Sequence, residues 1–299
     1  MRVLVGLGSC IAYENNGYDD ALRKTCLRQA HIKGVDYKVF IGDRLAITHN
    51  ISPQAWINFS PPHLMPHFPN EDTVVLPCDD GYFGAMWKTR EMFKWFLETK
   101  YDFLFHCDHD TYFSIDRLLS SGFENYEVAG LFGEHSVFAG PGYFVSRKAC
   151  KIYVDEIKDA VKGHRIGEAN FYCSYLPDLW LGILVKDHGL KMGTSSSFIH
   201  MTSREQEGPR KSNTVTSCHL STFRPGGYSP ELLLSLHAEW NNSWGTEEPN
   251  NHNSSKFTTV GYEGDLVLSP TQHVPVPVPP VAAPIPRRAN APVRPLTRR

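Results

Sequence analysis

One stretch, residues 101–113, constrains the fold of this chain more than any other. An apolar run over Phe103–Cys107 breaks abruptly into Asp108-His109-Asp110. The run predicts a buried strand, and the two aspartates then fall in the turn at its carboxyl end. In an open α/β sheet, ligands bind in the crevice beyond the carboxyl ends of the strands. The sequence therefore predicts an α/β fold in which Asp108 and Asp110 can bind a metal ion and its phosphates.

An Asp-x-Asp triplet alone is more often a helix N-cap or a solvated turn than a metal site. Its context here favours the metal site. A predicted strand precedes the triplet, an aromatic pair (Tyr112-Phe113) follows it, and Ser114 is placed to cap a helix that begins at Ile115.

The segments around this stretch predict a parallel sheet with helices on its faces. Strands over residues 3–8 and 37–42 flank a helix over 20–31, which is the β-α-β pattern with a right-handed crossover. Further strands are predicted over 73–77, 128–132 and after Gly142, and further helices over 85–99, over 151–160 (capped by Ser146) and from Pro177. On the helix over 85–99, the basic side chains are predicted to face solvent rather than a phosphate.

Composition limits the classes of partner and the compartment. The chain has 299 residues, 41% of them apolar, and a formal net charge of −2, so it can bury a full core and carries no overall field toward nucleic acid or membrane. No run of about 18 apolar residues or signal peptide is visible, which predicts a cytoplasmic protein. The seven cysteines contain no C-x-x-C pair, which favours reduced thiols.

The composition changes toward the C-terminus. Residues 1–240 are predicted to form the folded domain, and residues 241–269 an irregular polar extension. Residues 270–299 hold 9 of the 21 prolines, five arginines and no acid. This composition is typical of an extended or disordered tail, which could serve as a tether or a docking segment for a partner.

Three further features are candidates for the site. In Gly140-Pro141-Gly142 the glycines let the backbone approach a ligand closely, although a tight loop without a ligand explains them equally well. Asp178 follows Pro177 in the first turn of a predicted helix. His200 and His219 are possible metal ligands, but each by itself is more often an ordinary packed or surface histidine.

Taken in order, four blocks of this sequence resemble the β1,3-glycosyltransferases of the fringe and β3-galactosyltransferase type. Asp80-Gly81-Tyr82 with Lys88-Thr89 is similar to their D-S-Y…L-K-T segment, and residues 105–112 are similar to their strand ending in D-D-D-x-Y. Residues 140–147 resemble the G-x-G-Y-x-x-S-R block, and residues 178–182 the E-D-V-x-x-G block. The resemblance spans roughly residues 1–225, and its strength lies in four blocks in register.

The resemblance implies a GT-A fold, a Rossmann-like nucleotide-diphospho-sugar transferase with a mostly parallel central sheet flanked by helices. Asp108 and Asp110 would hold Mn²⁺ or Mg²⁺, with His219 completing the metal shell and His200 in reserve. Asp178 would be the general base of an inverting transfer from a UDP-sugar to a hydroxyl of a glycan, protein or other acceptor. The expected nucleotide-binding residues are Asp80, Lys88, Asp108, Gly140 and Gly142.

This chain departs from the family pattern at three points. His109 replaces the usual middle Asp, Pro177 replaces the acid before the expected base, and no membrane anchor is visible. Two other functions stay open. A metal-dependent phosphohydrolase or nucleotidyltransferase would use Asp79 and Asp80 together with Asp108 and Asp110, and a catalytically inactive protein of the same fold would bind a glycan or a partner without turnover.

Overall fold

The computed structural model describes residues 1–43, 69–81, 84–133, 136–157, 176–201, 216–220, 229–244 and 256–260. Residues 44–68 lie outside these ranges, and so does the Pro/Arg-rich tail over 270–299. The first compact unit runs from Met1 to Gly261, and the second, Tyr262–Arg299, is not among the described residues.

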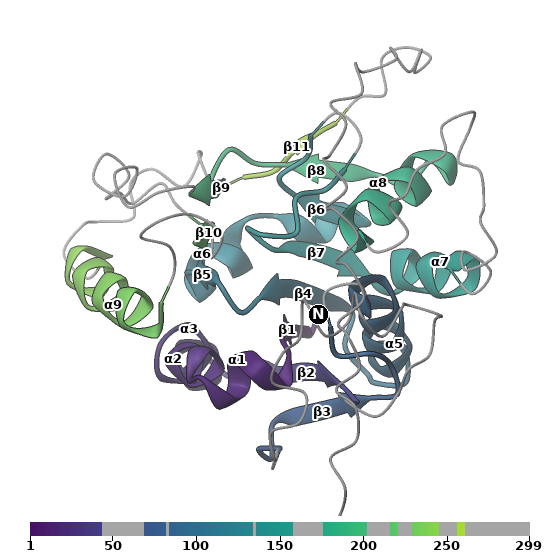
Figure 1. Cartoon of the computed structure of the whole chain (residues 1–299). Helices are drawn as coiled ribbons and strands as arrows, with labels where there is room; N and C mark the ends of the chain where they lie inside the picture. Colours follow the sequence, from purple (N-terminus) through teal and green to yellow (C-terminus); the bar gives the residue numbers. More distant parts are fainter. Residues whose placement is uncertain are drawn as a thin grey trace, which may run out of the picture. The chain divides into compact units, whose positions relative to one another are not determined.

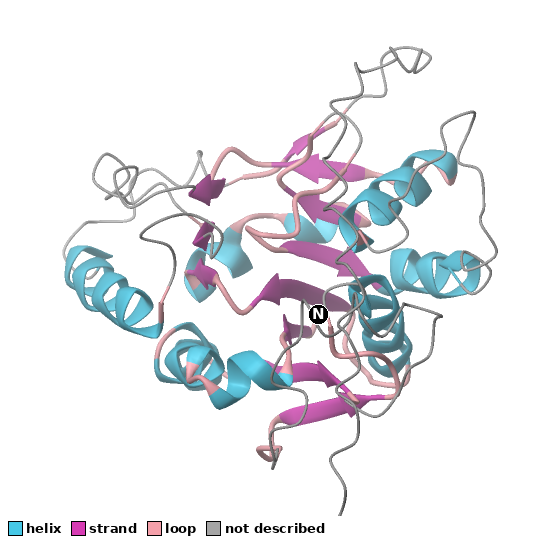
Figure 2. Cartoon of the chain, viewed as in Figure 1, coloured by secondary structure: helices cyan, strands magenta, loops and turns pink. Residues whose placement is uncertain are grey.

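The described strands form a large mixed sheet with helices on both faces (Figures 1 and 2). Its order is β11-β8-β6-β7-β4-β1-β2-β3. The parallel pairs are β1 with β2 and β4, β2 with β3, and β6 with β8, whereas β7 runs antiparallel to β4 and β6, and β11 to β8. The predicted α/β fold with a mostly parallel central sheet is confirmed. The strands are β1 (Val3–Gly8), β2 (Asp36–Gly42), β3 (Thr73–Leu76), β4 (Phe103–Asp108), β6 (Val128–Gly130), β7 (Tyr143–Ser146), β8 (Met192–Thr194) and β11 (Thr258–Thr259).

A second sheet of three strands lies beside the end of β4. It consists of β5 (Thr111–Phe113), β10 (Ser217–Leu220) and β9 (Phe198–Met201) in the order β5-β10-β9. The antiparallel register pairs His219 with Thr111. This small sheet therefore brings the segment around residue 219 next to the Asp108–Asp110 turn, about a hundred residues away in the chain.

Helices cover both faces of the large sheet because successive side chains of its central strands point to opposite sides. Val5 and Leu7 of β1 belong to one buried cluster and Leu4 to the other. The first cluster includes residues of α2 (Tyr18–Lys24), α3 (Cys26–Ile32), α6 (Ile115–Ser120) and α9 (Pro230–Trp244). The second includes residues of α5 (Ala85–Leu97), α7 (Arg147–Ile157) and α8 (Pro177–Asp187).

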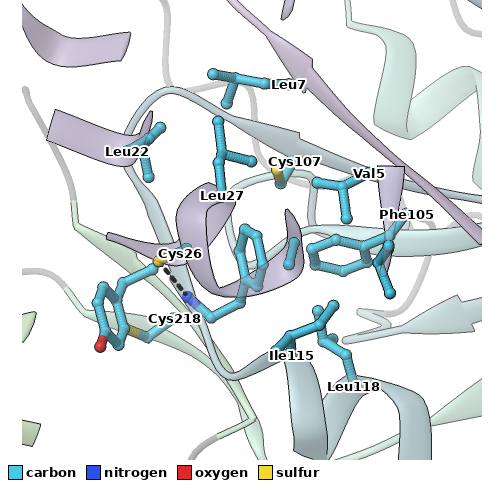
Figure 3. Close-up of a cluster of buried hydrophobic side chains, with 14 of the residues drawn as sticks. Val5, Leu7, Leu22, Cys26, Leu27, Phe105, Cys107, Ile115, Leu118 and Cys218 are labelled. Carbon is cyan, nitrogen blue, oxygen red and sulfur yellow. Dashed lines mark hydrogen bonds between the residues drawn. The ribbon is translucent and has the colours of Figure 1, made fainter. Parts of the chain in front are cut away.

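Figure 3 shows part of the first cluster, where Phe105 and Cys107 of β4 face Leu27 and Cys26 of α3 and Ile115 of α6. The backbone N–H of Phe113 donates a hydrogen bond to the Cys26 sulfur at 3.4 Å. All six described cysteines are free thiols, and all except Cys10 are buried. The six described cysteines therefore form no disulfide among themselves, and five of them lie in the core.

Several elements differ from the sequence-based expectation. The helix expected over 20–31 is two helices, α2 and α3, which are separated at Thr25 (φ −121°, ψ −105°), whose hydroxyl donates to the Ala21 carbonyl. Ser114 precedes α6 as expected but makes no capping hydrogen bond. Within 241–269, β11 pairs with β8 and Phe257 is buried in the first cluster, so this part of the expected extension packs with the domain. In the described residues, no helix has the length and apolar character needed to cross a membrane.

Candidate active site

The order of the strands places Asp108 at a topological switch point of the sheet. From β1 the chain adds β2 and then β3 on one side, and afterwards returns to add β4 on the other side (Figure 1). The carboxyl ends of β1 and β4 therefore flank a topological switch point, where open α/β sheets bind ligands. Gly8 lies opposite Asp108 in this register. A Cβ on Gly8 would lie 3.3 Å from Asp108 Oδ1, so the glycine leaves room for that carboxylate.

Asp108, Asp110 and His219 come together at this point. His219 Nε2 lies 2.9 Å from Asp110 Oδ2, and the Asp110 side chain is only 4% exposed. Burial and the charge of Asp110 raise the pKa of Asp108 to about 7. Burial alone would lower the pKa of His219, but the hydrogen bond that its ring donates to Asp110 and the charges of both aspartates outweigh this effect and raise that pKa. The site therefore concentrates negative charge that an added cation would stabilise.

The donor set fits a hard divalent cation, because two carboxylates and an imidazole are ligands that Mn²⁺ accepts and carboxylates suit Mg²⁺. In the part of the chain that the structure describes, no three His, Cys, Asp or Glu side chains converge in a ready-made metal-binding geometry. The Asp110–His219 hydrogen bond engages atoms that would bind the metal. Metal binding by these three residues therefore stays a prediction.

The Gly140-Pro141-Gly142 loop packs against the same group. The Asp108 N–H donates to Thr111 Oγ1 at 3.0 Å, and the Thr111 hydroxyl donates to the Gly140 carbonyl at 2.7 Å. A Cβ on Gly140 would lie 2.4 Å from His219 Cγ. Gly142 has a φ of 77°, and a Cβ there would lie 2.6 Å from Phe105 Cζ. Close packing therefore explains why glycine occupies positions 140 and 142. Nucleotide binding by these two residues stays a prediction.

Asp80 and Lys88 form hydrogen bonds that link the segments at the carboxyl ends of β1, β2 and β3. Asp80 Oδ1 accepts from the Gly42 N–H and Oδ2 accepts from the Ile11 N–H, each at 2.7 Å. Lys88 Nζ donates to the Ser9 carbonyl at 2.6 Å and lies 3.0 Å from Asp80 Oδ1. The expectation of a solvated face is wrong for Lys88, whose side chain is 12% exposed. Whether Asp80 or Lys88 also contacts a nucleotide stays a prediction.

Asp178 reaches the site from α8. Pro177 is the first residue of this helix, as expected, and Asp178 is the second. Its carboxylate accepts from the Leu179 N–H at 2.9 Å and also from the backbone of Ala139, next to Gly140. Burial raises the pKa of Asp178, and the charge of Asp178 in turn contributes to the raised pKa of Asp108. The structure therefore brings Asp178 close enough for its charge to act on Asp108, from a segment about 70 residues away in the chain.

Two residue pairs at the site gave no signal in the sequence. Tyr13, on the short helix α1 (Ile11–Asn15), stacks on His109 with ring centroids 3.5 Å apart and an interplanar angle of 16°. His106 Nδ1 lies 2.7 Å from the Tyr143 hydroxyl, and burial lowers the His106 pKa to about 3. A five-residue helix shows no apolar repeat, so only the fold reveals Tyr13.

His200 lies opposite His219 in the β9–β10 register.

Comparison with known proteins gives structural similarity only. No family model matches this chain, and no curated protein matches its sequence. A glycosyltransferase involved in glycosylation of the major capsid of PBCV-1 is 11% identical with a TM-score of 0.43, covering 80% of this chain and all of that one. The galactosyltransferase LgtC, in complex with donor and acceptor sugar analogs, is 11% identical with a TM-score of 0.44, covering 84% of this chain and 99% of that one.

A third similar structure is the glycosyltransferase GlyE of Streptococcus pneumoniae TIGR4. It is 12% identical with a TM-score of 0.44, and the match covers 82% of this chain and 63% of that one. With identities and TM-scores this low, the function proposed below rests on the residues of this chain.

Proposed function

We propose that this chain is a metal-dependent glycosyltransferase of the GT-A type, which transfers a hexose or N-acetylhexosamine from a UDP-sugar to an acceptor hydroxyl with inversion. The observation that supports the proposal is that His219 bonds to Asp110 beside Asp108 at the switch point of the sheet, where the charge of Asp178 also acts on Asp108. Asp108, Asp110 and Asp178 belong to the sequence blocks that resemble the fringe-type family. His219 lies outside these blocks and contacts Asp110 in the folded chain.

In this proposal each residue has a separate task. Asp108, Asp110 and His219 hold Mn²⁺ or Mg²⁺, which supplies positive charge for the leaving diphosphate. Asp178 accepts the proton of the acceptor hydroxyl. Its half-buried position raises its pKa, which brings a carboxylate closer to the range suited to a general base at neutral pH.

The bonding of Lys88 supports the metal requirement. The positive charge of Lys88 lowers the pKa of both Asp108 and His109, so this side chain lies near the proposed site. Among the described residues, Lys88 is therefore a candidate for contact with a phosphate group. However, its ammonium already donates to the Ser9 and Asp80 carbonyls and pairs with the Asp80 carboxylate. Because those bonds balance its charge inside the protein, we expect a divalent cation to neutralise the diphosphate.

The two alternatives are less well supported by this geometry. A phosphohydrolase built on four aspartates would need Asp80 as a free ligand, yet both Asp80 oxygens accept backbone hydrogen bonds. A glycan- or partner-binding protein without turnover would keep the same fold. In such a protein, Asp178 would not act as a general base, so ligand binding would not change in Asp178→Asn.

Donor binding is tested by calorimetric titration of the protein with UDP, with and without Mn²⁺. The proposal predicts binding that needs the metal and that Asp110→Ala abolishes. Asp116→Ala is the matched control, because that carboxylate is 66% exposed on α6. Absence of UDP binding in both conditions would refute the UDP-sugar donor.

Turnover is tested by a screen of UDP-sugars for hydrolysis and transfer, followed by proton NMR of the product. Asp178→Asn should leave UDP binding unchanged and reduce transfer by about a hundredfold or more, the usual contribution of a general base. The anomeric signal should show inversion. Wild-type turnover in Asp178→Asn, or a product with retained configuration, would overturn the assignment of the base.

A further inference from the structure

The residue between the two aspartates is in contact with two tyrosines. His109 stacks on Tyr13 at 3.5 Å between ring centroids, and Tyr18 meets both rings edge-on, at 5.7 Å from His109 and 5.2 Å from Tyr13. All three side chains are half-buried. Stacked and edge-to-face pairs of this kind add to stability beyond the area that they bury. The turn that carries Asp108 and Asp110 is therefore attached to the segment of α1 and α2.

The helix that carries Tyr13 is held by hydrogen bonds to residues outside the Asp108–Asp110 turn. Glu14, the next residue, accepts hydrogen bonds from Arg23 at 2.9 Å and from Asn70 and Thr73 at 2.8 Å each. At the start of α1, the Ile11 N–H donates to Asp80 at 2.7 Å. The helix that carries Tyr13 is thus held by contacts that do not involve the Asp108–Asp110 turn.

On the other side, the turn is held through Thr111. The hydroxyl of Thr111 accepts from the Asp108 N–H and donates to the Gly140 carbonyl. The stack on Tyr13 and the bonds of Thr111 therefore hold the turn from two directions. A loosely held turn would let the two carboxylates move apart, and metal affinity depends on ligands held in place by their surroundings.

We propose that His109 is a positioning residue, which holds Asp108 and Asp110 in place for the metal and the nucleotide diphosphate by stacking on Tyr13. This rests on the proposed function of the site. It also explains how an imidazole can occupy the middle of the triplet: its role is to present a flat ring to Tyr13, and the outer two residues carry the charge. An aromatic ring at position 109 should therefore suffice, and a carboxylate should not.

Substitutions at position 109 separate stacking from charge. His109→Ala should weaken Mn²⁺ binding, measured by electron paramagnetic resonance titration of the metal alone, by about tenfold, and His109→Phe should keep it within about twofold. His109→Asp adds a third carboxylate, which by charge alone would tighten Mn²⁺ binding. If His109 acts by positioning the turn, His109→Asp should bind Mn²⁺ more weakly than the wild type. His31→Ala, at an exposed histidine of α3, is the matched control.

Hydrogen exchange gives a readout that does not need the metal. The Asp108 amide, which donates to Thr111, should exchange at least several-fold faster in His109→Ala than in the wild type and should regain protection in His109→Phe. Tyr13→Leu should reproduce the effect of His109→Ala, and the double variant should add little to either, because the two rings act through one contact.

The outcomes are distinct from those of the UDP titration. Unchanged exchange of the Asp108 amide in His109→Ala, tighter Mn²⁺ binding in His109→Asp, or additive effects of the Tyr13 and His109 variants would each overturn the positioning role. Failure of the wild type to bind UDP, with the exchange difference present, would refute the proposed function and leave the stack established.

Discussion

Gly140→Ala is the change that most directly tests the geometry of the site. Gly140 is not in the left-handed region, so an added methyl group causes no backbone strain. Its effect is purely steric. The new Cβ would lie 2.4 Å from His219 Cγ, 2.5 Å from Nδ1 and 2.9 Å from Cδ2.

The magnitude follows from these distances. Ordinary carbon contacts need about 3.5 Å, so the imidazole must retreat by about 1 Å. These contacts are to the ring itself rather than to the end of a flexible side chain, and the ring is held by Asp110 at 2.9 Å. Overpacking costs about 1–3 kcal/mol, and a weakened bond to a charged group costs about 1.5–3 kcal/mol. We therefore expect Gly140→Ala to lower the free energy of unfolding by about 2.5–6 kcal/mol.

Urea denaturation measures this loss, and Mn²⁺-dependent UDP titration measures the displacement of His219. A second variant identifies the cause. In Gly140→Ala combined with His219→Ala the clash disappears, so the overpacking part of the loss, about 1–3 kcal/mol, should return. The loss of the bond to Asp110 should remain, and metal-dependent binding should stay weak. Wild-type stability and wild-type UDP affinity in Gly140→Ala would refute the packing of His219 against Gly140.

Two further predictions concern parts of the domain outside the proposed site. The Arg147 guanidinium donates to the Thr99 and Tyr101 carbonyls at 2.9 and 3.1 Å. Arg147→Met should therefore lower the free energy of unfolding, measured by urea denaturation, by about 3 kcal/mol, and Arg147→Lys should lower it by less. Equal stability of the wild type and both variants would contradict a stabilising role for these hydrogen bonds. Burial raises the pKa of Asp19, which bonds to the Ser9 hydroxyl, from 3.8 to about 7. The folded state then binds more protons than the unfolded state between about pH 4 and 7, so the unfolding free energy should fall with rising pH across that window, by up to about 4 kcal/mol. Asp19→Asn should remove the share of Asp19 and leave that of Asp108, whose pKa is also raised to about 7. An unchanged pH profile of stability would show that Asp19 does not contribute to the fall.

The sequence by itself determined most of the local elements of this protein. The apolar run before Asp108 predicted β4, the amphipathic pattern over 85–99 predicted α5, and Pro177 predicted the first residue of α8. These features depend on side-chain periodicity and on backbone preferences within a few residues, which are written in the local sequence. The α/β class followed from the order of such elements. The break at Thr25 escaped this reasoning because the apolar face continues across it.

Only the tertiary structure decided which residues meet. The register of β10 beside β5 pairs His219 with Thr111, which brings the His219 ring to Asp110, 109 positions away in the chain. The packing of α5 buries Lys88 against Asp80, although its basic side chains suggested a solvated face. The stack of Tyr13 on His109 joins the end of β1 to the end of β4. Each of these contacts depends on strand order and register, which are set by the burial of the whole core rather than by any local pattern.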